Sequence, residues 1–363
     1  MGKKRRIAIL TGGGDCAGIN AVIRAVAKKA ILEYGLEVVG IKDGYNGAIH
    51  NCHQKLRYSD VSGIITLGGT ILGTSNTANP YRYATKKNGK LEFEDVSKTT
   101  IANINQLGID CLVCIGGDGT LSIAHNLVKD GIPIIGIPKT IDNDLIGTDI
   151  TFGFDTAVSV ATEGIDRLHS TAQSHHRVMI VEVMGRNAGW IALHAGIAGG
   201  GDIILIPEIP YDINVIMEVV KERSRIGKRF SIIVVSEGAK ANDGNIVIKR
   251  IVKESTDPIR YGGVSFVLGS KIEELTGIET RAVVLGHLQR GGVPTSFDRV
   301  LATRLGTKAV EMIVNEAYGH MVGIKCDSLV EVPLEEVAKG QRTVPEDDPL
   351  VEAARTVGTC LGD

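Results

Sequence analysis

Short, mostly apolar runs alternate with longer amphipathic stretches along this chain. Six of these runs are followed within two residues by glycine, proline or a polar side chain: 6–10, 37–41, 111–115, 132–137, 178–183 and 231–236. Runs of this kind are typical of buried parallel strands. Between them, apolar residues recur at helical spacing, and we expect helices over 18–33 and 153–171. The pattern predicts an α/β fold: two doubly wound, Rossmann-like domains with mainly parallel sheets and an active site in the cleft between them.

The stretch from Ile109 to Asp144 contains the densest candidate chemistry. One predicted strand is followed by Gly116-Gly117-Asp118-Gly119-Thr120, and the next by Lys139-Thr140-Ile141-Asp142-Asn143-Asp144. The carboxyl ends of neighbouring parallel strands meet at one crevice, so these two loops should lie side by side. Glycines let backbone N–H groups approach phosphate oxygens, and a helix that begins near Thr120 would add its positive end.

Three carboxylates lie in these loops. Asp118, among glycines, is placed to hold a hard, oxygen-seeking cation such as Mg²⁺. Asp142 and Asp144 are two residues apart in a loop that we expect to be extended, so their side chains should point the same way and one of them can act as a base. A phosphate cradle, a metal carboxylate and a spare carboxylate together indicate phosphoryl transfer.

A second glycine turn follows the first predicted strand. Its residues are Thr11-Gly12-Gly13-Gly14-Asp15, and a predicted helix begins just after it, near Gly18. Strand, glycine turn and helix in this order are typical of a phosphate site, because the amino end of the helix favours anions. We therefore expect this turn to contact a phosphorylated ligand.

Charge and composition exclude several other classes of function. The 363 residues include 40 Lys and Arg against 42 Asp and Glu, so no general positive field favours nucleic acid, and an anionic ligand must be met by local arginines. No apolar run approaches the ~18 residues of a membrane span. The initial MGKKRR lacks the apolar segment of a secretory signal and the Ser or Thr of a myristoylation signal.

The six cysteines are dispersed, which is consistent with a reducing cytoplasm. Cys111 and Cys114 have the spacing of a redox or metal motif, but they lie in a predicted strand. Three strand residues span roughly 10 Å, and side chains at this spacing face opposite ways. Since a disulfide needs much closer Cα atoms, we interpret both as small buried apolar residues. A zinc site at His169, His175 and His176 is disfavoured, since adjacent residues rarely both reach one ion.

The Gly116–Thr120 and Lys139–Asp144 loops, read as GGDGT and TIDND, resemble those of the 6-phosphofructokinase family. GGDGT alone is also similar to NAD kinases and diacylglycerol kinases. The resemblance runs from about Ile7 to Gly323 and includes Met184–Gly189 and Thr280–Gly292. It implies an ATP-dependent, cytoplasmic enzyme that uses Mg²⁺ and transfers the γ-phosphoryl group of ATP to the 1-hydroxyl of fructose 6-phosphate. It also implies a homotetramer with active sites shared between subunits.

The resemblance further implies two domains and a role for each motif residue. Residues 1–153 plus 289–363 would bind the nucleotide, and residues 154–288 would bind the sugar phosphate. The residues expected to bind ATP are Gly14, Gly117, Asp118, Gly119 and Thr120, with Asp118 on the metal. The catalytic residues would be Asp142 as the base, Thr140 beside it, Asp144 supporting the loop, and Arg186 stabilising developing charge. The residues expected on fructose 6-phosphate are Thr140, Asp142, Arg177, Met184, Gly185, Arg186, Glu237, Arg281, His287 and Arg290, of which Arg177 and Arg281 would come from a neighbouring subunit.

Other features of the sequence match long-type and pyrophosphate-using relatives. Residues 240–267 form a longer stretch than compact bacterial relatives need, and the turn at 242–245 suggests an inserted hairpin. Asn76 stands where ATP-using relatives usually have Arg, near the transferring phosphates, and Arg82 is one candidate to substitute for that Arg. His169 stands where allosteric relatives have an effector-binding Arg. Residues 345–349 are typical of a solvated turn.

Two residues bear on the phosphoryl donor. Gly119 is Asp in most pyrophosphate-using relatives, and a carboxylate there would repel the α-phosphate of ATP. Lys139 is typical of pyrophosphate users, although some ATP users share it. We therefore expect ATP as the donor, with a pyrophosphate-dependent fructose 6-phosphate 1-phosphotransferase as the alternative. A non-catalytic nucleotide or sugar-phosphate sensor is the alternative of another class, but it would not need Asp142 beside Asp118.

Overall fold

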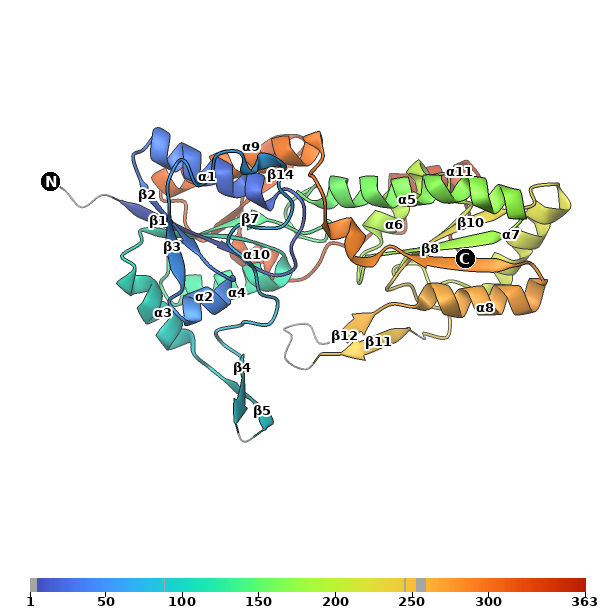
Figure 1. The fold of residues 1–363 in the computed structure, drawn as a ribbon, viewed down its shortest axis with the longest axis horizontal. Helices are drawn as coiled ribbons and strands as arrows, with labels where there is room; N and C mark the ends of the chain where they lie inside the picture. Colours follow the sequence, from blue (N-terminus) through green and yellow to red (C-terminus); the bar gives the residue numbers. More distant parts are fainter. Residues whose placement is uncertain (1–4, 88, 245, 253–258) are drawn as a thin grey trace.

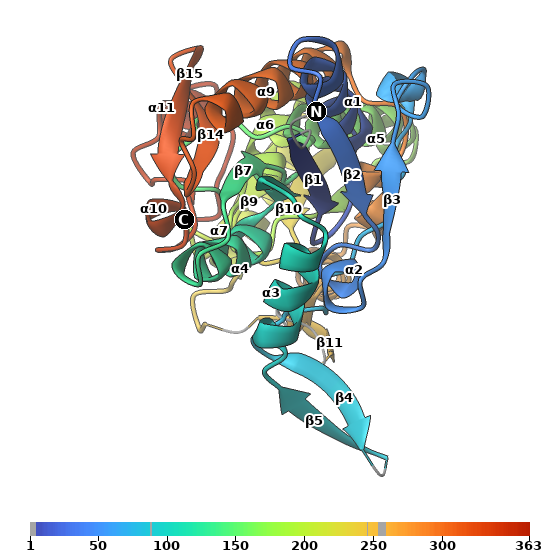
Figure 2. The same cartoon turned by 90° about the vertical axis from the view of Figure 1, so that its left-hand side faces the viewer.

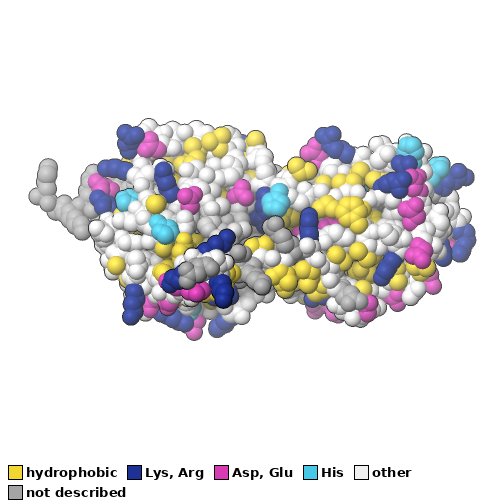
Figure 3. Space-filling model, turned by 60° about the horizontal axis from the view of Figure 1, so that its bottom comes forward, with side chains coloured by type: hydrophobic (Ala, Val, Ile, Leu, Met, Phe, Trp, Pro, Cys, Tyr) yellow, Lys and Arg dark blue, Asp and Glu magenta, His cyan; other side chains and the backbone are white. Residues whose placement is uncertain are grey.

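The computed structural model describes residues 5–87, 89–244, 246–252 and 259–363. These residues form two α/β lobes that lie side by side along the long axis of the molecule (Figure 1). In the space-filling view the molecule narrows to a waist between the lobes (Figure 3). Among the described residues, no helix combines the length and hydrophobicity that a membrane crossing requires.

The first lobe is built on a seven-stranded sheet in the order β15-β14-β7-β6-β1-β2-β3. Its central strands are parallel, and the two edge strands β15 and β3 are antiparallel to their neighbours. The strands are β1 (Arg6–Thr11), β2 (Glu37–Ile41), β3 (His53–Leu56), β6 (Cys111–Gly116), β7 (Ile134–Pro138), β14 (His320–Lys325) and β15 (Ser328–Pro333). The strands predicted from the apolar runs before residue 140 are confirmed, although β7 begins two residues later than expected.

Helices cover both faces of this sheet, as Figure 2 shows. On one face α1 (Ile19–Leu32) packs against α9 (Ser296–Val314). On the other lie α2 (Tyr45–Ile49), α3 (Ser97–Gln106), α4 (Asp118–Lys129) and α10 (Leu334–Val337). Alternate residues of β1 belong to the two cores, Ile7 and Ile9 to one and Ala8 and Leu10 to the other. This two-sided burial explains why the strand sequences are almost continuously apolar.

The second lobe contains a parallel four-stranded sheet in the order β13-β8-β10-β9. The strands are β8 (Val178–Val183), β9 (Ile203–Leu205), β10 (Ser231–Ser236) and β13 (Thr280–Val284). Helices α5 (Phe154–His175) and α6 (Trp190–Ala198) cover one face, and α7 (Ile213–Arg225) and α8 (Val264–Thr276) cover the other. The prediction of two doubly wound domains is confirmed. Helix α5 runs past its expected end and includes His175.

Two hairpins lie outside the main sheets. One is formed by β4 (Tyr83–Lys87) and β5 (Lys90–Glu94), the other by β11 (Ile248–Ile251) and β12 (Ile259–Tyr261). The hairpin predicted within residues 240–267 is present, but the turn at Asn242–Gly244 precedes it and does not connect its strands, so that part of the prediction is wrong. Asn245 lies outside the described residues.

The end of the chain contacts the second lobe. After α10, Cys360 forms a parallel bridge with Ile203, and α11 (Pro349–Thr356) packs on α6. Just before α11, Glu346 and Asp347 are exposed, as expected for a solvated turn. We keep the domain limits at 153/154 and 288/289 as a proposal, with the addition that the last residues lie beside the second sheet. The remaining short elements are η1 (Ile64–Thr66) and η2 (Gly286–Arg290).

Candidate active site

The two central loops lie side by side at the carboxyl edge of the first sheet. Strands β6 and β7 are parallel neighbours in which Gly116 pairs with Pro138. Directly beyond them, the N–H of Lys139 donates to the carbonyl of Gly116 at 3.0 Å. The prediction that these two loops lie side by side is therefore confirmed.

Glycine at positions 12 and 116 makes room for Thr120 at the start of α4. A Cβ on Gly116 would lie 2.2 Å from the Cβ of Thr120, and one on Gly12 would lie 2.6 Å from its Oγ1. Helix α4 begins at Asp118, two residues before the expected start. The two glycine turns therefore pack together around the amino end of one helix, an arrangement suited to binding phosphate.

Three side chains donate hydrogen bonds to backbone carbonyls of the turn after β1. Gly13 adopts φ +78°, which favours glycine, and its carbonyl accepts from Thr74 Oγ1 at 2.6 Å. Lys139 Nζ donates to the carbonyl of Gly14, and Arg290 Nη1 donates to the carbonyl of Asp15 at 3.0 Å. Lys139 is only 3% exposed, and burial lowers the pKa of its ammonium group. These contacts bring Lys139 and Arg290 to the glycine turn.

Asp142 presents a buried oxygen that has no hydrogen-bond partner among the described residues. That atom is Oδ1, while the backbone N–H of Asp142 donates to Thr140 Oγ1 at 3.1 Å. Burial is the main cause that raises the pKa of Asp142; the charge of Arg290 opposes the rise and that of Asp118 adds to it. An unpaired buried acceptor is costly, which makes this atom a candidate to accept a hydrogen bond from a ligand.

Asp144 lies beside Asp142 in a loop that is bent, not extended as predicted. The bend comes from Asn143, which adopts φ +50°, a left-handed conformation that Asn tolerates better than most residues. Asp144 Oδ1 accepts from Thr140 Oγ1 at 3.0 Å. Burial, followed by the charges of Asp142 and Asp118, raises the pKa of Asp144 to about 7. The predicted interaction between the two carboxylates is therefore present.

The second lobe contributes the loop after β8. The N–H of Met184 donates to Gln289 Oε1 at 3.2 Å, and Gly185 adopts φ +129°. A Cβ on Gly238 would lie 1.9 Å from the carbonyl oxygen of Arg186, so glycine is required for the loops after β8 and β10 to approach. The guanidinium of Arg186 lies 5.1 Å from the ring centre of Tyr261 in the second hairpin.

Charges from both lobes converge on this place. Glu237 follows β10, and burial, then the charges of Asp142 and Glu182, raise its pKa to about 7. The pKa values of Asp142 and Glu237 are both raised overall, and the positive charges of Arg290 and Arg186 oppose this rise. The structure thus brings together residues from four separate loops. His287 is exposed on η2, two residues before the buried Gln289.

Arg177 and Arg281 do not reach this cluster within one chain. They lie at the amino ends of β8 and β13, where Arg177 Nε lies 2.6 Å from Glu279 Oε2 and Arg281 pairs with the same carboxylate. The six residues of β8 span roughly 20 Å at about 3.3 Å per residue, and the Met184–Arg186 loop follows the opposite end. Hydrogen bonding from Arg177 lowers the pKa of Glu279.

Gln341 contacts two of the candidate residues, although no sequence motif indicates it. Its Nε2 donates to Asp118 Oδ2 at 3.0 Å and to Asp144 Oδ2 at 2.9 Å. Gln341 lies beyond the resembling segment, in a stretch without apolar periodicity. It reaches the site because it forms an antiparallel bridge with Leu145, and no local pattern indicates that contact.

The carboxylates of Asp118 and Asp144 suit Mg²⁺, which takes only part of its ligands from the protein. Across the described ranges, no group of three or more His, Cys, Asp and Glu side chains is arranged to hold a metal ion. Asp118 is exposed at the first turn of α4, and its carboxylate shares the Gln341 nitrogen with that of Asp144. Mg²⁺ is commonly held by one or two carboxylates together with substrate phosphates and water, so this set of oxygens suits it.

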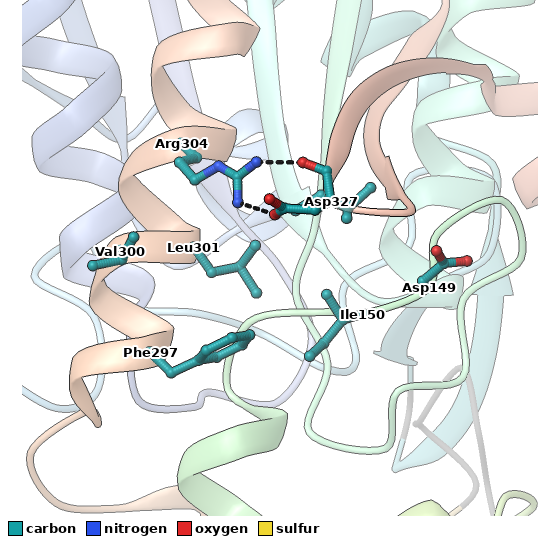
Figure 4. A pocket seen from close by; sticks show the side chains of 8 residues that line it. Asp149, Ile150, Phe297, Val300, Leu301, Arg304 and Asp327 are labelled. Atoms are coloured by element: carbon teal, nitrogen blue, oxygen red, sulfur yellow. Dashed lines mark hydrogen bonds and ion pairs between the residues drawn. The ribbon is translucent and has the colours of Figure 1, made fainter.

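Of two cavities lined by described residues, one adjoins the site. One of about 390 Å³ lies between the loop after β2 and the β4–β5 hairpin, and its lining includes Asp43, Ser75, Tyr83 and Lys86. The other, of about 230 Å³, lies under α9 (Figure 4). Its lining includes Phe297, Val300 and Ile150, and its rim carries the Arg304–Asp327 ion pair at 2.6 Å. The first adjoins the turn at Gly13 through Thr74 and Ser75, whereas the second contains none of the catalytic candidates.

Comparison with known proteins gives consistent matches. Residues 6–313 match the family model described as Phosphofructokinase. The chain is 53% identical over 361 residues to ATP-dependent 6-phosphofructokinase 2 of Clostridium perfringens, covering 99% of each chain. It is 49% identical over 343 residues to the pyrophosphate–fructose 6-phosphate 1-phosphotransferase of Amycolatopsis methanolica, covering 94% of this chain and 97% of that one. The T-state crystal structure of Pichia pastoris phosphofructokinase matches with a TM-score of 0.79 and 31% identity, covering 99% of this chain but 37% of the longer Pichia chain.

Proposed function

The chain belongs to the phosphofructokinase family, and from this premise we propose that it is an ATP-dependent 6-phosphofructokinase. The reaction transfers the γ-phosphoryl group of ATP to the 1-hydroxyl of D-fructose 6-phosphate, giving fructose 1,6-bisphosphate and ADP. The observation that carries the proposal is the buried Oδ1 of Asp142, which has no hydrogen-bond partner in the part of the chain that the structure describes and feels the charges of Arg290 and Arg186. A sugar hydroxyl that donates to this oxygen would satisfy it and place its proton on a base.

The donor would occupy the side of the site made by the first lobe. The residues proposed to line its phosphates are Gly14, Gly117, Gly119 and Thr120. The amino end of α4 favours phosphate, and Lys139 adds a positive charge beside Gly14. Asp118 would hold Mg²⁺, which when bound neutralises charge on the transferring phosphate. Asp144 would hold the loop of the base in place through Thr140.

The acceptor would occupy the side made by the second lobe. Met184 and Gly185 shape the loop, Glu237 would accept from a sugar hydroxyl, and His287 and Arg290 would meet the sugar phosphate. Arg186 would stabilise charge that develops as the phosphoryl group moves. Its position in the same electrostatic neighbourhood as Asp142 and Glu237 supports this role.

The cavity beside Ser75 favours ATP over pyrophosphate as the donor. At about 390 Å³, with polar side chains in its lining such as Asn46, Thr77 and Lys86, it offers room beyond the phosphate turns for a nucleoside. Pyrophosphate has no group to fill such a space. Gly119 is exposed at the start of α4 and has no side chain, so this position offers no carboxylate to repel the phosphates of ATP. The Amycolatopsis relative makes pyrophosphate the second candidate donor.

An oligomer would complete the sugar-phosphate site. Arg177 and Arg281 pair with Glu279 at the far end of the second sheet, so within one chain they cannot meet fructose 6-phosphate. We place them in the site of a neighbouring subunit, within a homotetramer. Exposed large apolar side chains offer surface for subunit contacts. Val300 is 61% exposed and Phe297 is 48% exposed. A cytoplasmic location is consistent with buried free thiols such as Cys111 and Cys114.

A product assay tests the proposal. Purified protein is incubated with fructose 6-phosphate, Mg²⁺ and either ATP or pyrophosphate, and fructose 1,6-bisphosphate is measured. Product with ATP, formed with a higher kcat/KM than with pyrophosphate, supports the kinase. Tight binding of both substrates in calorimetry without product would favour the sensor.

A further inference from the structure

Residues 341–344, which we call the strap, cross from the first lobe to the second beside the candidate active site. In the first lobe, Gln341 pairs with Leu145 and the N–H of Arg342 donates to the carbonyl of Asp144 at 2.8 Å. In the second lobe, the N–H of Val344 donates to Glu208 Oε1 at 2.8 Å. The strap therefore connects the loop of the proposed base to the opposite lobe.

Gln341 is the residue of the strap that forms hydrogen bonds with the proposed site residues. Its nitrogen donates to Asp118 and Asp144, and its oxygen accepts from Asn187 Nδ2 at 2.8 Å. Ionised carboxylates only accept hydrogen bonds, so the amide nitrogen must face the aspartates and the oxygen must face Asn187. Glutamine is the only neutral side chain of this length whose terminal amide carries two N–H donors on its nitrogen and an acceptor on its oxygen. Asn187 directly follows Arg186, so one amide joins three loops.

We propose that Gln341 is a positioning residue of the phosphoryl-transfer site. By donating to Asp118 and Asp144 and accepting from Asn187, it fixes the donor loop, the base loop and the Arg186 loop relative to one another. This inference rests on the proposed function, because it assigns Gln341 a role in that same reaction. Phosphoryl transfer depends mostly on positioning, and a displacement of about 1 Å can cost about 100-fold in rate.

A neutral amide suits this position better than a charged side chain. Asp118 and Asp144 both accept from the same nitrogen of Gln341, and a glutamate at 341 would place a third negative charge against these two carboxylates. A lysine would pair with the aspartates but would have no acceptor for Asn187. The chemistry of the three neighbours therefore selects glutamine.

The test compares Gln341→Leu and Gln341→Glu with the unmodified protein. Leu keeps a similar volume and removes all three hydrogen bonds, while Glu keeps the shape and the acceptor but loses the donors. We expect Gln341→Leu to lower kcat about 10- to 100-fold with KM for fructose 6-phosphate changed less than about 3-fold. Gln341→Glu should lower kcat further. Gln106→Leu, at an exposed site at the end of α3, is the matched control and should leave both constants unchanged.

A second readout does not depend on turnover. Trp190 is the only tryptophan of the chain, is 3% exposed, and donates through Nε1 to the carbonyl of Arg342 at 3.2 Å. The guanidinium of Arg342 lies 4.2 Å from its ring centre. Tryptophan fluorescence therefore reports on the strap. If Gln341 only positions side chains, the Gln341→Leu spectrum and Tm should match the unmodified protein while kcat falls.

Three results would overturn the inference. A kcat within 2-fold of the unmodified value for both variants would show that Gln341 does not position the site. A loss of kcat matched by a red-shifted Trp190 spectrum and a lower Tm would show a structural staple instead. If Gln341→Leu fails to fold, Asn187→Ala removes only the other partner, and unchanged kcat in that variant would also count against the proposal. Absence of product in the unmodified protein with either donor would instead refute the proposed function.

Discussion

Lys139 donates through Nζ to the carbonyl of Gly14, so the loop after β7 is joined to the glycine turn after β1. The lysine is 3% exposed, and burial lowers its pKa. It thus connects the loop of the proposed base to the glycine turn after β1 and adds a charge beside that turn. We propose that such a residue assists any phosphate donor, so Lys139 should not discriminate between ATP and pyrophosphate.

Replacing the proposed base should abolish turnover without unfolding the protein. In Asp142→Asn the amide is nearly isosteric but cannot take a proton, and loss of a general base costs about 10²- to 10⁴-fold in kcat. Steady-state kinetics together with a thermal melt of the same preparation measure both effects. A folded variant with near-full kcat would show that another group accepts the proton.

The rate should fall on acidification at a pH above the ordinary pKa of aspartate. The base must be ionised to act, and burial raises the pKa of Asp142 while Asp118 adds to the rise. Protonation therefore begins at higher pH than for an exposed carboxyl, and kcat/KM should decline as pH falls through that raised value. A pH profile of kcat/KM over pH 4–9 measures the decline, and a decline that begins only at the ordinary aspartate pKa of about 4 would contradict the assignment. Because Asp142 and Asp144 interact, the profile reports the pair.

Most of the secondary structure could be predicted from the sequence, because burial on both faces leaves continuous apolar runs. Strands β2, β8 and β10 begin and end where those runs do. The site was harder where it depends on contacts distant along the chain. Gln341 lies 197 residues from Asp144, and no periodicity indicates that pairing. The left-handed Asn143 also escaped the prediction of an extended loop, since Asn adopts either conformation.

Asp144→Asn should raise the Tm, relative to the unmodified protein, more at high pH than at low pH. Its pKa is raised to about 7 in the folded state, so the unfolded chain loses this proton at lower pH. The stabilising contribution is present below the unfolded pKa and is lost as pH rises through the folded value. The Tm of Asp144→Asn relative to the unmodified protein should therefore be a few degrees more favourable at pH 8 than at pH 5. Calorimetry at several pH values measures the Tm difference between the two proteins. A difference that is the same at pH 5 and pH 8 would show that the pKa of Asp144 is not raised.

Removing Arg281 should weaken binding of fructose 6-phosphate in an oligomer. Loss of hydrogen bonds to a charged phosphate costs about 1.5–3 kcal/mol, so KM for the sugar in Arg281→Ala should rise about 10- to 100-fold with kcat less affected. Arg225→Ala is a matched control, because Arg225 is an exposed arginine paired with Glu222 on α7. Sedimentation of active protein tests the shared site, and a fully active monomer would exclude it.

The donor preference should depend on Gly119. This residue is exposed in the first turn of α4, next to Thr120, against which the two glycine turns pack. An aspartate there would place a negative charge where the α-phosphate of ATP must pass, whereas pyrophosphate ends before that point. Gly119→Asp should therefore lower kcat/KM for ATP by about 10-fold or more, corresponding to repulsion of about 1–4 kcal/mol near a protein surface. Asn126→Asp adds the same charge further along α4 at an exposed site and should leave the ratio of the two donors unchanged. In the unmodified protein kcat/KM should be higher with ATP. A higher value with pyrophosphate would overturn the assignment, because Lys139 and Asn76 would then outweigh the open path at Gly119.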